Sequence, residues 1–368
     1  MAHRRRTIEV MKRLLVLLVA LASALALGQT LDKTKHVGYL VWSSEGPRGH
    51  LEQALLDAMR ADGYVEGKNL VIERRYIEGN ADDLRAAASE LAAMKLNLIV
   101  STCSDSTRAA KQATAASPVP IVMAYVSDPV GQGLIASYSR PGGNITGLAS
   151  QAEDTLPKML QYLTEVVPPG TRVAVLYHTI APSHPLLWRR LEAVARESGI
   201  SVSRVDIVTR ADLPAAFNTI ARDGYGALLV LPDDNMTFNA RAELIELVKR
   251  QRIPAIFGLR EFVDSGGLMS YGPSIASGYR KAAVYVDKVL AGARPAELPV
   301  EQPTKFELVV NTGAARALGV TISQDLLLRA DDIVRDAKGG APTRPLARRA
   351  RGKGEPKRPA TACSDRPD

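Results

Sequence analysis

Cysteine and histidine are scarce in this chain, which has two cysteines and five histidines among 368 residues. Cys363 lies in a polar C-terminal segment and Cys103 in the body, so we expect no structural disulfide and interpret Cys103 as a small buried thiol. Two thiols are too few for a zinc site, and the histidines form no ligand-spaced pair on one helix. The sequence therefore predicts neither a metal site nor a cofactor.

The motifs of common enzyme sites are missing as well. The chain has no G-x-x-x-x-G-K-[ST] phosphate loop, no G-x-G-x-x-G after its first strand, no G-x-S-x-G elbow and no H-E-x-x-H. We therefore predict no catalytic residues. The alternative is a secreted α/β hydrolase-like enzyme that uses Asp128, Asp233 or His178.

The formal net charge of +8 is concentrated at the two ends of the chain. Residues 1–28 carry five basic and one acidic side chain, and residues 338–368 carry nine basic and three acidic ones, so the body between is close to neutral. Residues 338–368 have almost no large apolar side chains and are predicted to form a disordered basic tail. A nearly neutral body gives no reason to expect a nucleic-acid partner.

Residues 1–28 have the features of a secretory signal peptide. A basic start is followed by an apolar run over 14–27, which is shorter than the roughly 20 residues that span a bilayer. Ala24 and Ala26 have the spacing that signal peptidase reads, and Met11 begins a shorter signal. The pattern predicts export to the periplasm and cleavage of this segment.

Short β-branched runs alternate with amphipathic stretches along the body, which is typical of parallel βαβ units. A first series has predicted strands at 37–42, 69–75, 96–101 and 121–125. A second series follows a strand at 144–148 and a helix at 155–166, and has strands at 172–177, 202–208, 227–231 and 255–257. Beyond it we expect a strand at 268–271, a helix at 275–290, a strand at 305–310 and helices at 312–318 and 323–336, with Thr321 or Ser323 as N-cap.

Polar and aromatic residues follow several predicted strands, and ligands of open parallel sheets bind at those carboxyl ends. Ser104, Asp105 and Ser106 lie where a helix predicted over 106–115 begins, and its free backbone amides would attract a small anion, although each of these residues is equally compatible with a plain helix cap. Asp128 would pair with an ammonium group, or else be a turn residue before Pro129. The candidate ligand-binding residues are Trp42, Ser43, Thr102, Ser104, Ser106, Tyr125, Asp128, His178, Asp233 and Arg260.

Six strings carry a resemblance to a known family. They are GYVEGKNL at 63–70, AAKQAT at 109–114, SDPVG at 127–131, RPGGNITG at 140–147, GGLMSYG at 266–272 and EQPTKFEL at 301–308. In these strings the chain resembles the ABC-transporter substrate-binding proteins that include tryptophan- and tyrosine-binding members. The polar loop S-T-C-S-D-S-T at 101–107 and the turn at 177–179 depart from the family pattern.

The resemblance implies an α/β fold of the type I periplasmic binding proteins, with two Rossmann-like lobes joined by three hinge crossovers. It places lobe 1 at 35–147 plus 272–303 and lobe 2 at 148–271 plus 304–336. It also implies a monomer without catalysis that binds a small molecule, an amino acid with aromatic ones favoured, and delivers it to an ABC permease in the inner membrane. A sensory receptor of the same fold is the alternative.

Overall fold

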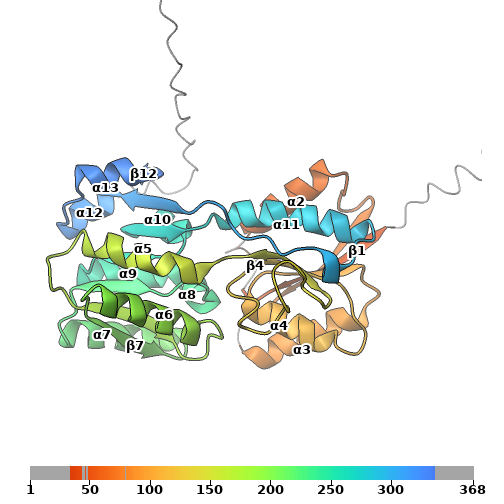
Figure 1. Ribbon diagram of the computed structural model, residues 1–368, viewed down its shortest axis with the longest axis horizontal. Coiled ribbons are helices and arrows are strands. Elements are labelled where there is room, and N and C mark those ends of the chain that lie inside the picture. The colour runs from red at the N-terminus through yellow and green to blue at the C-terminus, as the bar shows by residue number, and fades with distance from the viewer. Residues whose placement is uncertain (1–33, 44–45, 47–48, 79, 336–368) are drawn as a thin grey trace, which may run out of the picture. The chain divides into compact units, whose positions relative to one another are not determined.

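The computed structural model describes residues 34–43, 46, 49–78 and 80–335 (Figure 1). The predicted signal peptide and the predicted basic tail lie outside these residues. Within the described ranges, no helix is both long and apolar enough to cross a membrane.

The first series of elements and the strand that follows it form a five-stranded sheet in the order β2-β1-β3-β4-β5, with every neighbouring pair parallel. Its strands are β1 (Lys35–Val41), β2 (Leu70–Tyr76), β3 (Leu98–Ser101), β4 (Ile121–Val126) and β5 (Ile145–Ala149). Its helices are α2 (Gly49–Ala61), α3 (Ala81–Ala93) and α4 (Ser104–Ala113). We call this sheet with its helices the first lobe.

The second series forms a seven-stranded sheet in the order β12-β11-β10-β9-β8-β6-β7, parallel except for the β10–β11 pair. Its strands are β6 (Val173–His178), β7 (Val202–Ile207), β8 (Ala227–Val230), β9 (Ala255–Phe257), β10 (Met269–Gly272), β11 (Glu307–Asn311) and β12 (Asp332–Val334). We call this sheet with its helices the second lobe.

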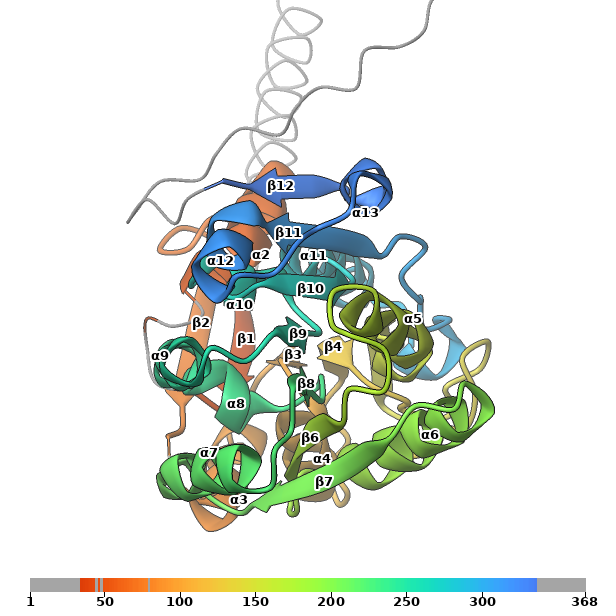
Figure 2. The same ribbon diagram turned by 90° about the vertical axis from the view of Figure 1, so that its left-hand side faces the viewer.

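The second lobe has helices on both faces of its sheet. They are α5 (Ala152–Thr164), α6 (His184–Glu197), η1 (Arg210–Asp212), α7 (Leu213–Arg222), α8 (Asn235–Asn239), α9 (Arg241–Gln251), α10 (Arg260–Asp264), α12 (Thr312–Leu318) and α13 (Gln324–Arg329). Figure 2 shows α5 and α6 on one face and α7 and α9 on the other, with β7 and β12 at the two edges. Covering both faces explains why the central strands β6, β8 and β9 are buried along their whole length.

The chain passes between the two sheets three times. It leaves the first sheet after β5, returns after β10 into α11 (Ile275–Leu290), and leaves again after η2 (Pro295–Glu297) to form β11. Figure 1 shows α11 beside α2, on the face of the first sheet opposite α3 and α4. Two crossings lie side by side, because Leu148 forms a parallel bridge with Glu301.

The C-terminal end of the body differs from the predicted helix at 323–336. Of the two N-cap residues predicted from the sequence, Thr321 and Ser323, the structure uses Ser323, whose Oγ accepts from the Leu326 amide. The helix α13 ends at Arg329 because Ala330 is extended and the Asp331 carboxylate accepts from the Leu308 amide at 3.1 Å. The chain then continues as the edge strand β12, where the sequence analysis had expected helix.

Candidate ligand-binding site

Loops from the carboxyl ends of the strands in both lobes meet at a single place, which we call the lobe junction. Ser104, the first residue of α4 in the first lobe, donates from Oγ to Asp233 Oδ2 at 3.1 Å. Asp233 follows β8 in the second lobe. Gln132 Nε2 donates to the same Ser104 Oγ at 3.0 Å, so one hydroxyl links two loops of the first lobe to the second lobe.

The start of α4 is built so that the buried Ser104 hydroxyl faces the second lobe. The N-cap is Cys103, whose Sγ accepts from the Ser106 amide, and Ser106 Oγ accepts from the Cys103 amide at 3.1 Å. Ser106 and Thr102 are buried in this local network, since the Thr102 amide also donates to Ser106 Oγ. Cys103 and Ser106 therefore cap the helix, and the Ser104 hydroxyl is available to bond Asp233.

The loop after β8 turns two consecutive carboxylates in different directions. Asp233 has a left-handed backbone with φ of 60°, which Asp tolerates better than most residues. Asp234 caps α8 by accepting from the Met236 and Thr237 amides, and it also contacts His178 Nδ1 at 2.9 Å. Asp234 is thus engaged within the second lobe, while Asp233 faces the first.

His178 ends β6 and uses both ring nitrogens. Nδ1 contacts Asp234 and Nε2 lies 2.9 Å from the Val208 carbonyl oxygen. Burial alone would lower the pKa of His178, but the hydrogen bond and negative charge of Asp234 raise it overall. The neighbouring His184 is buried, which lowers its pKa to about 4, and its Nδ1 accepts from the His178 amide at 2.9 Å.

Three further carboxyl groups at the junction hold their protons more tightly than usual. Burial and, secondly, the charge of Asp234 raise the pKa of Asp105 to about 7. Burial raises the pKa of Asp233 to about 8, with Asp105 and Glu153 adding to the effect. Burial also raises the pKa of Glu153, although Ser127 Oγ donates to it at 3.1 Å.

A cavity of about 400 Å³ opens beside these groups and is lined from both lobes. Gln132 and Ser183 connect it to Asp233, because Gln132 donates to Ser104 and Ser183 Oγ donates to the Asp233 carbonyl oxygen at 3.2 Å. The lining residues are Arg108, Ser127, Asp128, Gly131 and Gln132 from the first lobe, and Pro182, Ser183, Pro185, Leu186 and Arg189 from the second. Two guanidinium groups and one carboxylate, that of Asp128, therefore line one ligand-sized space.

Asp128 and Tyr125 lie on the first-lobe side of the junction. Asp128 lines the cavity from a turn with φ of 32°, where its Oδ1 accepts from the Gly131 amide at 2.8 Å. Tyr125 is partly buried at the end of β4, and burial together with the charges of Asp233, Glu261 and Glu153 raises its pKa well above 10.

Trp42 and Ser43 form a second contact between the lobes. Ser43 Oγ donates to Asn239 Oδ1 at 2.9 Å, and Asn239 Nδ2 donates to the Trp42 carbonyl oxygen at 3.3 Å. The Trp42 ring itself packs against the apolar core of the first lobe. The structure thus gives Trp42 a packing role as well as its place at the junction.

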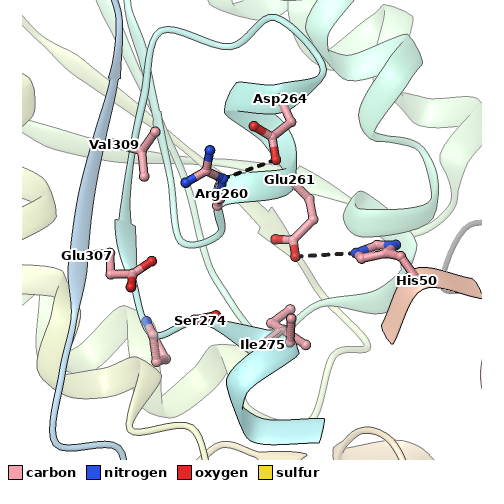
Figure 3. Close-up of a pocket in the computed structure, with 11 residues that line it drawn as sticks. His50, Arg260, Glu261, Asp264, Ser274, Ile275, Glu307 and Val309 are labelled. Atoms are coloured by element: carbon pink, nitrogen blue, oxygen red, sulfur yellow. Dashed lines mark hydrogen bonds and ion pairs between the residues drawn. The ribbon is translucent and has the colours of Figure 1, made fainter. Parts of the chain in front are cut away.

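Arg260 lies at a different cavity, of about 200 Å³, near the crossing from β10 to α11. Its guanidinium lies 3.3 Å from Asp264 and 2.7 Å from Asp332, so it is neutralised within the second lobe. Figure 3 shows this cavity with His50, from α2, facing Glu261 at 3.7 Å. The structure does not bring Arg260 to Ser104 and Asp233.

Sequence reasoning did not select several residues at the junction. Asp105 and Asp234 were visible only as neighbours of chosen residues in polar loops. Gln132, Glu153, Ser183, Arg189 and Asn239 lie one or more turns beyond the strand ends, where no local pattern marks them. Within the described residues, no group of three or more His, Cys, Asp and Glu side chains could hold a metal ion.

Two α/β lobes, three crossings and a cavity lined from both sides define a protein of the solute-binding class. Residues 42–334 match the family described as ABC transporter substrate binding protein, and the chain belongs to that family. This confirms the resemblance seen in the six sequence strings, and with it the predicted fold.

Individual relatives agree with this assignment. The chain is 24% identical over 309 residues to a tyrosine-binding protein from Clostridioides difficile (strain R20291), covering 83% of this chain and 88% of the relative. A conserved domain protein from Vibrio cholerae O1 biovar El Tor N16961 has a TM-score of 0.75 at 27% identity, covering 82% of this chain and 100% of that one. An ABC domain in complex with L-Trp, from Streptococcus pneumonia, has a TM-score of 0.74 at 21% identity with the same coverage.

Proposed function

We propose that this protein binds an amino acid at the lobe junction and delivers it to an ABC permease for import. The observation that carries the proposal is the cavity of about 400 Å³ whose lining comes from both lobes, directly beside the Ser104–Asp233 contact. Its volume falls near the lower end of the range for small-molecule sites, roughly 300–1,000 Å³.

The charges at the junction suit a zwitterion. Arg108 and Arg189 line the cavity from opposite lobes and are donors for an α-carboxylate. The Asp128 carboxylate lines the same cavity and is an acceptor for an α-ammonium group, and Asp233 is joined to the lining through Ser183. A ligand that contacts both lobes stabilises their approach through its differential affinity for that state.

Aromatic amino acids are the favoured ligands in this proposal. The support comes from the relatives, one described as tyrosine-binding and one solved with L-Trp, and from Tyr125 at the end of β4. Export to the periplasm and a monomeric state belong to the same proposal, which follows what the family resemblance implies.

Binding is favoured over catalysis because His178, the histidine that contacts a carboxylate at the lobe junction, has no free ring nitrogen. Both ring nitrogens of His178 are occupied, by Asp234 and by the Val208 carbonyl oxygen. A general base needs a nitrogen within reach of a substrate proton. We therefore propose that the ligand is returned unchanged.

Mass spectrometry of the small molecule that co-purifies, followed by thermal shift against the twenty amino acids, tests the proposal. A ligand at 100 times its dissociation constant should stabilise the native state by about 2.7 kcal/mol. If no amino acid raises the melting temperature and none is recovered from the purified protein, the proposed ligand class is wrong.

Two serine-to-alanine variants test the location of the site. Ser104→Ala removes a hydroxyl that bonds both Asp233 and Gln132, so we expect affinity to fall about tenfold, the equivalent of about 1.4 kcal/mol. Ser89→Ala, on the exposed face of α3 in the same lobe, is the matched control and should bind as the wild type does. Equal affinity in both variants would mean that Ser104 does not contribute to ligand binding.

A further inference from the structure

A series of hydrogen bonds joins the larger cavity to the contact between the lobes. Arg108 Nη2 donates to Gln132 Oε1 at 3.0 Å, and Gln132 Nε2 donates to Ser104 Oγ at 3.0 Å. Ser104 Oγ in turn donates to Asp233 Oδ2 at 3.1 Å. Arg108 and Gln132 line the cavity from the first lobe, whereas Asp233 belongs to the second. The series therefore connects a cationic side chain of the cavity with the second lobe.

The direction of each hydrogen bond in this series is fixed. A guanidinium only donates, so the carbonyl oxygen of the Gln132 side chain must face Arg108 and its amide nitrogen must face the other way. That nitrogen also donates to the Ser127 carbonyl oxygen, a pure acceptor, at 2.6 Å. Ser104 thus receives a hydrogen from Gln132 and donates its own to Asp233.

The backbone of Gln132 is held by the turn that begins at Asp128. The Gln132 amide donates to the Asp128 carbonyl oxygen at 3.0 Å. On the other side of Gln132, the Gly133 carbonyl oxygen accepts from Lys111 Nζ of α4 at 2.6 Å. This turn and α4 are therefore joined by two contacts, one from Arg108 and one from Lys111, so the Gln132 side chain starts from a fixed place.

The two guanidinium groups that line the cavity are held to different degrees. Arg108 is half-buried and is bound by Gln132. Arg189 is exposed, and within the described residues no side chain forms a hydrogen bond or an ion pair with it. Ordering a free arginine side chain costs conformational entropy, and Arg108 has lost part of that freedom before a ligand arrives. Arg108 is thus the better prepared of the two to bind a carboxylate.

We propose that Gln132 is a positioning residue for the carboxylate of the ligand: it holds the Arg108 guanidinium at the cavity and links it, through Ser104, to Asp233 of the second lobe. This inference rests on the proposed function, because it specifies which residues recognise the α-carboxylate of the amino acid. A ligand without a carboxylate gains nothing from a well-placed Arg108. Gln132 therefore contributes to the selectivity for amino acids over their decarboxylated amines.

Calorimetry with L-tryptophan and tryptamine tests the proposal. Tryptamine keeps the ring and the ammonium group and lacks only the carboxylate, so the wild type should favour L-tryptophan at least about tenfold. Gln132→Met keeps the side-chain length but removes both polar groups, and it should lower the affinity for L-tryptophan about tenfold. It should change the affinity for tryptamine by no more than about twofold, because Ser104 still bonds Asp233.

L-tyrosine and tyramine should give the same pattern. If the thermal-shift panel identifies another amino acid, that amino acid and its decarboxylated amine take their place. The quantity compared is always the ratio of the two affinities, which a merely structural role of Gln132 would leave unchanged.

Gln132→Glu tests the direction of the hydrogen bonds and keeps the proposal testable if Gln132→Met does not fold. A glutamate carboxylate pairs with Arg108 and neutralises it, and it has no hydrogen to donate to Ser104 or to the Ser127 carbonyl oxygen. We expect this variant to lose the preference for L-tryptophan. Gln112→Met, on the exposed face of α4, is the matched control and should keep the wild-type preference.

The outcomes separate this inference from the proposed function. If Gln132→Met weakens both ligands by the same factor or changes neither, or if Gln132→Glu keeps the wild-type preference, the positioning role is overturned, and binding by the wild type leaves the amino-acid site standing. Equal affinity of the wild type for L-tryptophan and tryptamine overturns it as well. If the wild type binds none of the twenty amino acids, the proposed ligand class is wrong, and the positioning role fails with it.

Discussion

Asp234 joins two structural tasks in one side chain. It accepts from the Met236 and Thr237 amides at the start of α8 and it contacts His178 in the neighbouring strand-end loop. Its carboxylate is 3% exposed, so water cannot replace these partners. His178, which this side chain binds, is not among the residues that line the larger cavity.

Two substitutions of Asp234 should separate its contribution as the N-cap of α8 from its contact with His178. Asp234→Ala removes both the helix cap and the bond to His178, and we expect it to lower the free energy of unfolding by about 2–3 kcal/mol. Asp234→Asn keeps a good N-cap, so its cost should be about 1 kcal/mol. Chemical denaturation of both variants measures this difference, and equal losses would mean that the cap contributes nothing.

The cost of Asp234→Asn should depend on pH. Burial opposes ionisation of Asp234, but its hydrogen bond with His178 and the positive charge of that imidazole lower its pKa below 3.8, so that stability is lost as pH falls through that range. The pKa of His178 is raised above 6.5, so the stability it gains is present below 6.5 and lost as pH rises further. The variant should therefore lose most, relative to wild type, between about pH 4 and pH 6.5.

At the scale of elements, the pairing of β5 with β4 requires a glycine in β5. Gly147 has φ of 125°, and a Cβ there would lie 2.2 Å from the Met123 carbonyl oxygen. Gly147→Ala must distort the β4–β5 pairing, so we expect a loss of more than 3 kcal/mol in chemical denaturation, beyond the usual range for a point mutation. Gly49→Ala, where nothing lies within 4 Å, is the control and should be within about 1 kcal/mol of wild type.

The elements that could be predicted from sequence are those with a complete periodic pattern. The predicted helix at 275–290 has the bounds of α11, and the apolar run at 255–257 has those of β9. The helices α8 and α10 have five residues each, too few to show a helical period, and they were missed. The end of α13 was misplaced because the Asp331–Leu308 contact joins residues far apart in the chain.

At the scale of the whole molecule, several loops that the sequence singled out meet at the lobe junction, but the sequence did not predict which of their residues would be in contact. Ser104 and Asp233 are 129 positions apart, and their contact depends on where three crossings place one sheet against the other. Arg260 follows β9 as Asp233 follows β8, yet its ion pair with Asp332 of the edge strand β12 holds it at another cavity. A position after a strand end therefore identifies the loops that meet, and contacts between residues far apart in the chain decide which of their side chains approach one another.

Contacts that exist only when the lobes meet should contribute to ligand affinity. Asn239 makes two such contacts, because it forms hydrogen bonds across the junction with Ser43 and with the Trp42 carbonyl oxygen. None of these three residues lines the larger cavity. Asn239→Ala should weaken binding of the identified ligand about fivefold, close to 1 kcal/mol, because it destabilises the bound arrangement of the lobes without touching the ligand.

Asn218→Ala is the matched control for this prediction, because Asn218 lies on the exposed face of α7 in the same lobe. Calorimetry should give the control wild-type affinity, and stopped-flow binding should show that Asn239→Ala mainly speeds dissociation, since the lost bonds form after the ligand is engaged. Unchanged affinity in Asn239→Ala would mean that the second contact between the lobes is already present, at equal strength, before the ligand arrives.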